Sequence, residues 1–597
     1  MEKDLPKISE EVKLKFGPES DIIKEYMEEV SKIVNSKFNQ KTTKEFTSKW
    51  INRQLQSPEI DDDFEEDELE TLKNLSSSEV QSLLVSKEKT YSQIVKQYQL
   101  LKAEGKNEHN EMTWSLFEKP LTKAQEIDGD LLEMTKTEIE EKYPLLGFVM
   151  SIKDSIYMKD TPTTCGLFVN LDRVATRNPE MINILRNKGV VMTSKGNIPQ
   201  LLFSAECGNN LYGQGMNPYD KTRTCGGSSG GEAALIALGY NNCAIGTDIG
   251  GSIRIPALFC GVAGLKPTSR RLSFQPHSTF FHRKFGSEKI PCQVNSIHDI
   301  QFVIPPTMGP LARNIHDVEK IMKVLVQDQS YDRYVHPIPW RSDMKYTKKI
   351  GVFKGISMVE LGPTAKRAID ESIQALLAAK YEVIEFDIDD IFEDAVANAC
   401  IAFNKNKYLR TIIYGETKIK EPLFPLYSLV KQLYSAPIFM VKFMANREKN
   451  ERRKFLLDSF LKSRKIPQQE LMKLRDALYY KLVERMNEQR VCALLAPGVP
   501  TPAFKLQLSN KCLLANMYTF AWNYLDMPTG VIKVCNVRED EQFYESKYND
   551  ELTKCLKLNA QDSKGMPMGI SVVGRAMEEE IVVSVLKDIE NNLGKIL

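Results

Sequence analysis

Two glycine-rich segments hold the residues best suited to chemistry. They read Cys225-Gly-Gly-Ser-Ser-Gly-Gly-Glu232 and Gly246-Thr-Asp-Ile-Gly-Gly-Ser-Ile-Arg254, with a short apolar run, residues 233–238, between them. Glycine lets the backbone approach a ligand closely, at an entropic cost that a binding site tolerates more readily than a packing surface does. Ser228 and Ser252 place hydroxyl groups among many backbone N–H donors. This combination suits nucleophilic attack on a carbonyl, with donors near the developing oxyanion.

Two other interpretations of the glycines fit less well. The segment 226–230 matches G-x-S-x-G, the nucleophile elbow, which would make Ser228 the nucleophile. The elbow needs a strand directly before it, whereas residues 218–224 are polar and turn-like, and it leaves Ser252 unexplained. A phosphate-binding P-loop needs Lys-Ser or Lys-Thr after the glycines, and neither follows them here.

A lysine upstream of both segments could supply a base. Lys153 follows a largely apolar run, residues 145–152, in which a strand is expected. Burial there would lower the pKa of the lysine toward the neutral form, which can accept a proton. Taken alone, a lysine beside Asp154 at a strand end is more often a solvated ion pair. The two serines make the functional interpretation the stronger one.

Together these segments resemble the amidase signature family, and within it the fatty acid amide hydrolase branch. The resemblance runs from about residue 75 to the C-terminus. Several separated motifs in the expected order argue against a chance match. The matching segments are Ser151–Ser155, Gly226–Gly231, Gly250–Arg254, Met308–Arg313, Tyr524–Gly530 and Gly565–Ile570.

The resemblance implies a Ser–cis-Ser–Lys triad, with Lys153 as the base, Ser228 as the bridging cis-serine and Ser252 as the nucleophile. The spacings of 75 and 24 residues are those of the fatty acid amide hydrolase branch. The substrate-binding set that it implies consists of Ser228, the backbone donors of Ile249, Gly250, Gly251 and Ser252, and the channel residues Leu202 and Phe203. Asp248 and Arg254 flank the nucleophile loop and are expected to form an ion pair that holds its shape.

Length and composition bound the class of protein. The chain has 597 residues, 42% of them hydrophobic, which suits one large α/β domain with additions. The net charge of +1 gives no sign of a nucleic-acid partner. Eleven cysteines without C-x-x-C pairs and six histidines without an H-E-x-x-H pattern argue against a disulfide framework and a metal centre. We expect no metal, no cofactor and a reducing compartment.

Strand-like apolar runs alternate with helical patterns from residue 143 onward, which predicts an α/β fold. The resemblance implies the amidase signature fold, a mixed twisted central sheet covered by helices on both faces. A βαβ unit is predicted with strands at 349–353 and 381–386 around a helix at 365–377. Further strands are predicted at 491–495, 530–535 and 568–573, and residues 400–490 are predicted to be mainly helical.

The chain divides into an extension and a main domain. Residues 1–75 are charge-rich, with an amphipathic helix expected over 21–34 and a solvated acidic block at 61–67. Residues 76–597 are predicted to form the amidase domain, and Ser76 with Glu79 is typical of a helix capping box. The stretch 271–306 is interpreted as a surface insertion.

Membrane contact is expected without a membrane span. No run of 18 apolar residues and no apolar leader occur, so neither a transmembrane helix nor a secretory signal is predicted. Residues 423–444 form two apolar segments with sparse lysines, split by Pro437, which is typical of an interfacial helix pair. They resemble the membrane-binding cap of fatty acid amide hydrolases. A buried helical hairpin is the alternative.

The resulting hypothesis is a fatty acid amide hydrolase that acts on N-acylethanolamines and primary fatty amides. It is expected to be intracellular, either cytoplasmic or peripherally associated with endomembranes, and the branch suggests a homodimer. An amidase of the same family with another substrate is the first alternative. A subunit of a tRNA-dependent amidotransferase and a catalytically inactive lipid-binding relative are the others.

Overall fold

The structure, a computed structural model, describes most of the chain. The described residues are 25–32 without 27 and 31, 40–55, 66–116, 118–273, 283–285, 288–290, 303–327, 332, 335–404 and 438–593.

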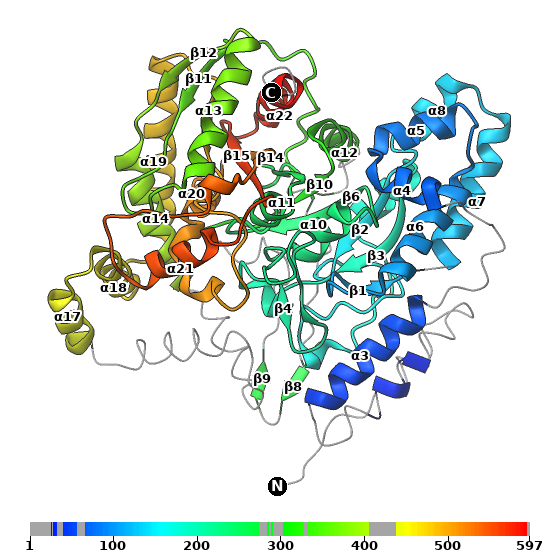
Figure 1. Ribbon diagram of the computed structural model, residues 1–597, viewed down its shortest axis with the longest axis horizontal. Helices are drawn as coiled ribbons and strands as arrows, with labels where there is room; N and C mark the ends of the chain where they lie inside the picture. Colours follow the sequence, from blue (N-terminus) through cyan, green and yellow to red (C-terminus); the bar gives the residue numbers. More distant parts are fainter. Residues whose placement is uncertain are drawn as a thin grey trace.

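Within these residues, eleven strands form one large sheet (Figure 1). In order across the sheet they are β1 (Met112–Ser115), β3 (Val191–Gly196), β2 (Val149–Lys153), β6 (Cys243–Asp248), β10 (Thr307–Ala312), β7 (Ala263–Lys266), β14 (Thr529–Asn536), β15 (Pro567–Val573), β13 (Ala493–Pro497), β11 (Lys349–Val352) and β12 (Glu382–Glu385). A separate short pair consists of β4 (Gly208–Asn209) and β5 (Gly213–Gln214).

The sheet is mixed, as predicted. β2 runs parallel to both β3 and β6, and β11 runs parallel to both β12 and β13. The pairs between these two groups, from β6 through β10, β7, β14 and β15 to β13, are antiparallel, and so is β1 against β3.

Helices surround the sheet (Figure 1). The first group is α3 (Gln40–Leu55), α4 (Glu66–Asn74), α5 (Ser77–Val85), α6 (Tyr91–Gly105), α7 (Glu118–Glu133), α8 (Lys136–Lys142) and α9 (Glu180–Asn187). The central group is α10 (Gly230–Ala237), α11 (Arg254–Cys260), α12 (Ile315–Gln327), α13 (Pro363–Ala378) and α14 (Asp389–Asn404). The last group is α17 (Ile438–Arg447), α18 (Glu451–Ser463), α19 (Gln468–Glu488), α20 (Met517–Tyr524), α21 (Glu551–Ala560) and α22 (Glu579–Leu593).

Both faces of the sheet are covered. A Cβ atom on Gly264 of β7 would meet Ile253 and Ala257 at the start of α11. A Cβ atom on Gly530 of β14, which pairs with Leu265, would instead meet α22. Because neighbouring residues of a strand point to opposite faces, α11 and α22 cover opposite sides of the sheet. The predicted fold class is therefore confirmed.

Local patterns located several elements correctly. The predicted βαβ unit is β11, α13 and β12, and its strands are parallel neighbours. Ser76 and Glu79 form the predicted capping box at the start of α5, each side chain bonded to the backbone of the other residue. β13, β14 and β15 occupy the three further strand predictions to within a few residues.

The described part of the N-terminal extension packs against the edge of the sheet. Tyr26 and Val30 are buried beside Trp50 of α3 and Trp114 of β1, and the Tyr26 ring meets the Trp114 ring edge-on at 5.2 Å. The Tyr26 hydroxyl donates to the Leu171 carbonyl at 2.9 Å. This apolar cluster covers the edge strand β1. The domain boundary at residue 75 stays a prediction.

Parts of five sequence predictions lie outside the described residues. They are the remainder of the 21–34 helix, residues 61–65 of the acidic block, most of the 271–306 insertion, residues 405–437 of the mainly helical stretch 400–490 and, within it, residues 423–437 of the membrane segment. The insertion contributes the hairpin of β8 (Arg283–Phe285) and β9 (Glu288–Ile290). Residues 438–444 belong to α17. None of the described helices is long and apolar enough to span a bilayer.

Candidate active site

The sheet topology brings the predicted catalytic segments to one edge. Lys153 is the last residue of β2, and Asp248 is the last residue of the parallel neighbour β6. The carboxyl ends of parallel neighbours lie at the same edge of a sheet, where α/β proteins commonly bind ligands. Ser228 directly precedes the capping residue of α10, and Ser252 lies in the loop from β6 to α11.

Lys153 contacts Ser228 in the interior. Its Nζ lies 2.7 Å from Ser228 Oγ, and it also donates to the Thr247 hydroxyl at 2.8 Å and to the Thr247 carbonyl at 3.1 Å. The lysine is 0% exposed and Ser228 is 1% exposed. The Gly227–Ser228 peptide bond is cis. The structure thus joins two of the three predicted triad residues directly.

Asp154, the neighbour of Lys153 in sequence, binds other groups. Asp154 forms a buried ion pair with Lys195 at 3.4 Å. Its other carboxylate oxygen accepts hydrogen bonds from the Thr164 hydroxyl, at 2.7 Å, and from the Cys165 amide, at 3.0 Å. The solvated Lys153–Asp154 pair considered from the sequence is therefore not formed.

Burial lowers the pKa of Lys153 toward the neutral range. Loss of hydration lowers the pKa of Lys153 to about 8, although the negative charges of Glu232 and Asp248 oppose the shift. Burial disfavours the ammonium form, since that form loses more hydration energy than the neutral amine does. A neutral amine in contact with a serine hydroxyl is consequently accessible near physiological pH.

Asp248 fixes the loop that carries Ser252. Its carboxylate accepts from the Gly251 amide at 2.8 Å and from the Ile253 amide at 3.0 Å, and it pairs with Arg254 at 3.0 Å. Burial alone would raise the pKa of Asp248, but the Arg254 guanidinium holds it well below its usual range. The predicted ion pair is confirmed, and it shapes the loop through backbone bonds. The amide of Ser229 also donates to the Ser252 carbonyl at 3.0 Å, which links the two glycine segments.

The loop departs from the sequence prediction at Gly251. The prediction included its amide among the oxyanion donors, yet that N–H is engaged by Asp248. Gly251 has φ of 120°, and a Cβ atom there would lie 2.3 Å from the Thr519 hydroxyl, so glycine is required. In the described part of the chain, the amides of Ile249, Gly250 and Ser252 have no hydrogen-bond partner. The candidate oxyanion donors are therefore the backbone amides of Ile249, Gly250 and Ser252.

An aromatic row lies beside the nucleophile loop. A Cβ atom on Gly250 would lie 3.3 Å from the Phe520 ring of α20. The Phe520 ring meets Phe403, at the end of α14, with centroids 5.9 Å apart, and Phe403 meets Phe203 at 5.4 Å. Leu202 ends a short 3-10 turn and Phe203 follows it, and both are half-buried.

The sequence prediction named Phe203 but neither Phe403 nor Phe520. Neither residue belongs to a motif, although Phe520 lies just before the Tyr524–Gly530 segment. Phe520 meets the nucleophile loop because α20 is bonded to it: Thr519 donates to the Gly250 carbonyl at 2.8 Å, across 269 residues of sequence. Such a contact leaves no local pattern in the chain.

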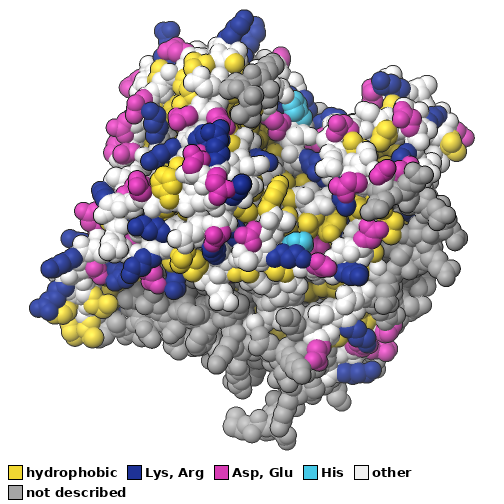
Figure 2. Space-filling view, in the orientation of Figure 1, with side chains coloured by type: hydrophobic (Ala, Val, Ile, Leu, Met, Phe, Trp, Pro, Cys, Tyr) yellow, Lys and Arg dark blue, Asp and Glu magenta, His cyan; other side chains and the backbone are white. Residues whose placement is uncertain are grey.

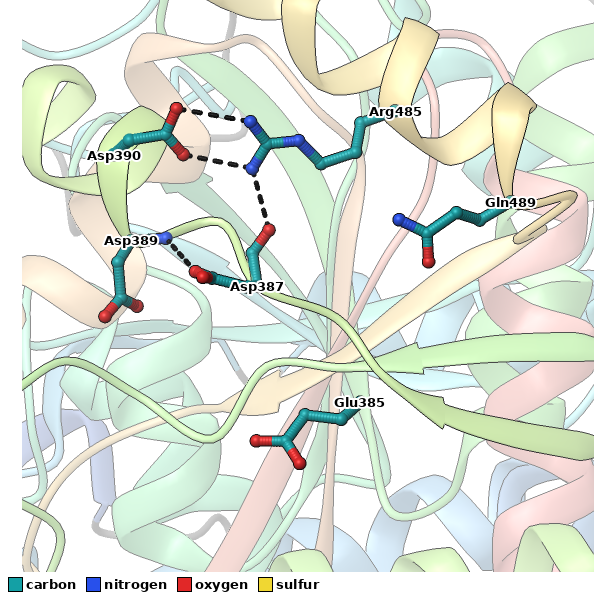
Figure 3. Close-up of a pocket in the computed structure, with 6 residues that line it drawn as sticks. All are labelled: Glu385, Asp387, Asp389, Asp390, Arg485 and Gln489. Atoms are coloured by element: carbon teal, nitrogen blue, oxygen red, sulfur yellow. Dashed lines mark hydrogen bonds and ion pairs between the residues drawn. The ribbon is translucent and has the colours of Figure 1, made fainter.

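An open pocket elsewhere has a different character (Figure 3). Arg485 of α19 reaches across it to the Asp390 carboxylate, at 3.0 and 3.2 Å, and to the Asp387 carbonyl. The pocket is lined by Glu385, Asp387, Asp389, Asp390, Arg485 and Gln489. None of the predicted site residues lines it, and its guanidinium is already engaged. We interpret it as an ion-pair network that ties α19 to the start of α14.

Among the described residues, no cluster of His, Cys, Asp and Glu could hold a metal ion. The segment before Ser228 forms turns and isolated β-bridges rather than the strand that a nucleophile elbow requires. The site is thus a buried lysine–serine contact beside a rigid glycine loop. This arrangement is suited to acyl transfer from an amide.

Comparisons with known proteins agree with that chemistry. The profile of the family described as Amidase matches residues 93–583. Fatty acid amide hydrolase 1 of Caenorhabditis elegans is 28% identical over 483 residues, covering 78% of this chain and 79% of the relative. Acetamidase of Emericella nidulans is 27% identical over 500 residues, covering 79% and 83%. A solved structure of a fatty acid amide hydrolase has a TM-score of 0.69 at 21% identity, covering 96% of this chain and 94% of that one.

The matched fold and family define an amidase-type hydrolase that cleaves C–N amide bonds. The chain belongs to the amidase family.

Proposed function

We propose that this amidase hydrolyses fatty acid amides through an acyl-enzyme, with Ser252 as nucleophile, Ser228 as proton bridge and Lys153 as base. The observation that carries the mechanism is the 2.7 Å contact between Lys153 Nζ and Ser228 Oγ, both buried beside the Ser252 loop. Ser252 is 9% exposed and is the most accessible of the three residues, as a group that meets substrate must be.

Catalysis proceeds in two stages. Neutral Lys153 accepts the proton of Ser228, Ser228 accepts the proton of Ser252, and Ser252 Oγ bonds to the amide carbon. The amides of Ile249, Gly250 and Ser252 donate to the oxyanion, and one such donor commonly contributes a factor of about 10²–10³ in rate. Ser228 then passes a proton to the amine nitrogen as the C–N bond breaks, because an unprotonated amine leaves poorly. Water attacks the acyl-enzyme by the same proton path and restores Ser252.

The aromatic row supports an acyl chain as the substrate's apolar part. It begins against Gly250 and continues through Phe520 and Phe403 to Phe203. Each buried methylene of an acyl chain contributes roughly 0.8 kcal/mol. The relative from Caenorhabditis elegans bears the name of a fatty acid amide hydrolase, whereas the fungal acetamidase keeps small amides as the alternative.

A hydrolysis panel tests the substrate class. Across amides of increasing acyl length, kcat/KM is expected to rise roughly fourfold per buried methylene, the equivalent of about 0.8 kcal/mol. Phe403→Ala should lower kcat/KM for long-chain amides by about three- to tenfold, since an aromatic pair is worth about 0.5–1.5 kcal/mol. Acetamide hydrolysis should change little.

Phe543, which is 48% exposed, provides the matched control for this panel. Phe543→Ala should leave the chain-length dependence as it is in the parent. A kcat/KM that falls with acyl length would instead favour a small-amide amidase. Absence of hydrolysis with every amide, and of acyl-enzyme formation, would favour the inactive relative.

The exposed side of α17 supports contact with a membrane surface. Phe439 is 69% exposed and Phe443 57% exposed, one helical turn apart, whereas Val441 and Ala445 on the other side are buried. The Arg447 guanidinium lies 4.4 Å from the Phe443 ring centroid. Figure 2 shows this apolar patch at the lower left of the molecule, next to dark blue cationic side chains. Apolar residues flanked by cations are typical of helices at a lipid interface.

Serine substitutions on α17 test membrane binding. Replacing Ile438, Phe439, Phe443 and Met444 with serine should reduce co-sedimentation with phospholipid vesicles and lower activity on long-chain amides in vesicles. All four side chains are exposed, so the fold should survive, as measured by circular dichroism and thermal melting. Leu132→Ser with Leu558→Ser, two exposed residues on other helices, is the control. A variant that folds and still sediments as the parent does would contradict membrane binding through α17.

A further inference from the structure

Glu232 is a buried acid that the mechanism above does not use. It lies in the first turn of α10, the helix that follows Ser228, and is 0% exposed. Its Oε1 accepts the Gly196 amide at 2.9 Å. Its Oε2 is buried and has no hydrogen-bond partner among the residues that the structure describes.

The backbone is shaped around this carboxyl group. A Cβ atom on Gly196 would lie 2.1 Å from Glu232 Oε1, so only glycine leaves room for it. Gly196 ends β3 and is the register partner of Lys153 in the parallel β2–β3 pair. The carboxyl group therefore lies against the strand position next to the lysine. The two side chains are not in direct contact, and the charge of each acts on the other through the buried interior.

An acceptor for the Gly196 amide does not by itself require an acid. A neutral glutamine oxygen would accept that hydrogen bond equally well. Burying a carboxylate oxygen without a hydrogen-bond partner is costly unless the group is protonated or faces a cation. Burial indeed raises the pKa of Glu232 to about 8, and the charge of Lys153 opposes this rise. Glu232 is thus an ionisable side chain at a position where burial makes its ionised form unfavourable.

The other charged groups around Lys153 and Glu232 are compensated. Asp248 is paired with Arg254, and Asp154 is paired with Lys195. Thiols also face the pair, and burial raises the pKa of two of them, Cys207 and Cys225, so that these stay uncharged. The third thiol that faces Lys153 is that of Cys165. Within the described residues, Glu232 is therefore the acid facing Lys153 that has no ion-pair partner of its own.

We propose that Glu232 is a positioning residue that sets, through its charge, the fraction of Lys153 present as the free base. The proposal rests on the proposed function, in which neutral Lys153 accepts the Ser228 proton. The negative charge of ionised Glu232 stabilises the ammonium form of Lys153. When Glu232 is protonated this stabilisation is lost, and a larger fraction of Lys153 is present as the neutral amine. The fraction of Lys153 in the amine form therefore depends on the coupled titration of Lys153 and Glu232.

Glu232→Gln tests the proposal because it keeps the acceptor for Gly196 and removes the charge. Without the negative charge the ammonium form is less favoured, so the pKa of Lys153 falls. The acid limb of the kcat/KM profile, and of the rate of fluorophosphonate acylation, should move to lower pH by about one unit. The alkaline plateau should stay within about twofold of the parent, because the amine form predominates there in both proteins.

Glu111→Gln is the matched control. Glu111 is likewise 0% exposed, has a carboxylate oxygen with no hydrogen-bond partner among the described residues, and has a pKa raised to about 7 by burial. The carboxylates whose charges act most strongly on Lys153 are, however, those of Glu232 and Asp248. The substitution of Glu111 should leave the acid limb in place. An unmoved limb in Glu232→Gln, an equal shift in both variants, or a uniform loss of rate at every pH would overturn the proposal.

The reverse coupling gives a second measurement. The infrared carboxylic acid band of Glu232 is identified by its loss in Glu232→Gln, which separates it from the bands of other buried acids such as Glu579. Lys153→Met removes the cation, so this band should persist to higher pH than in the parent. A band that titrates at the same pH with and without the lysine would overturn the proposal. An acid limb in the parent that survives Lys153→Ala would instead reject the lysine-base mechanism itself, so the two failures are distinguishable.

Discussion

Ser252→Ala is expected to lower amide hydrolysis by a factor on the order of 10⁴–10⁶ and to abolish labelling by a serine-directed fluorophosphonate. The variant loses the only oxygen that can form the acyl bond in the proposed mechanism, while Asp248 still holds the loop through the Gly251 and Ile253 amides. Fold and melting temperature should therefore change little. Intact-mass analysis after fluorophosphonate treatment measures the outcome.

Ser228→Ala separates the two possible nucleophiles. In the proposed mechanism it slows labelling but leaves Ser252 able to react. Under the nucleophile-elbow interpretation Ser228→Ala removes labelling and Ser252→Ala spares it. An acyl adduct on Ser228 in the parent, located by peptide mapping, would therefore reverse the assignment.

Lys153→Ala is expected to lower kcat by about 10²–10⁴-fold near neutral pH, the usual contribution of a general base. The base is the neutral amine, so the rate of the parent should rise with pH through the lowered pKa of about 8 and level off above it. The variant should lack this limb and recover partly at high pH, where hydroxide replaces the amine. Single-turnover rates from about pH 6 to about pH 10 measure both profiles.

Lys266 offers a comparison for the lysine variant. It is also buried, with a pKa lowered by burial to about 8, but its Nζ donates to the Pro267 carbonyl instead of contacting a catalytic serine. Lys266→Met should keep the acid limb at the same pH as in the parent. A flat profile in the parent, with chemistry shown to limit the rate, would exclude the lysine base.

The sequence alone determined the family resemblance, the fold class and the candidate catalytic residues. The two candidate serines and the α/β class follow from local information: glycines that allow close approach, serines between them, and apolar periodicity that distinguishes strands from helices. The capping box at Ser76 and the βαβ unit from β11 to β12 are of the same kind, because each is encoded within a short stretch of chain. The triad roles and the mixed, covered sheet are what the family resemblance implies.

Only the tertiary structure decided how these residues are used. Lys153 has an aspartate next to it in sequence, yet its partner is Ser228, because the pairing of β2 with β6 buries the lysine beside α10 and directs Asp154 to Lys195. The sequence predicts the Gly251 amide as an oxyanion donor, but in the folded protein this amide donates to the Asp248 carboxylate.

The sequence likewise does not indicate that Phe403, Phe520 and Glu232 are candidate site residues. They become candidates through contacts with segments far away in sequence: Phe520 meets Gly250, and Glu232 accepts the Gly196 amide. Contacts of this kind arise when a sheet and its helices assemble, and they impose no spacing or periodicity on the chain. Burial, which moves the pKa of both Lys153 and Glu232, is also a property of the assembled fold and not of either residue's neighbours in sequence.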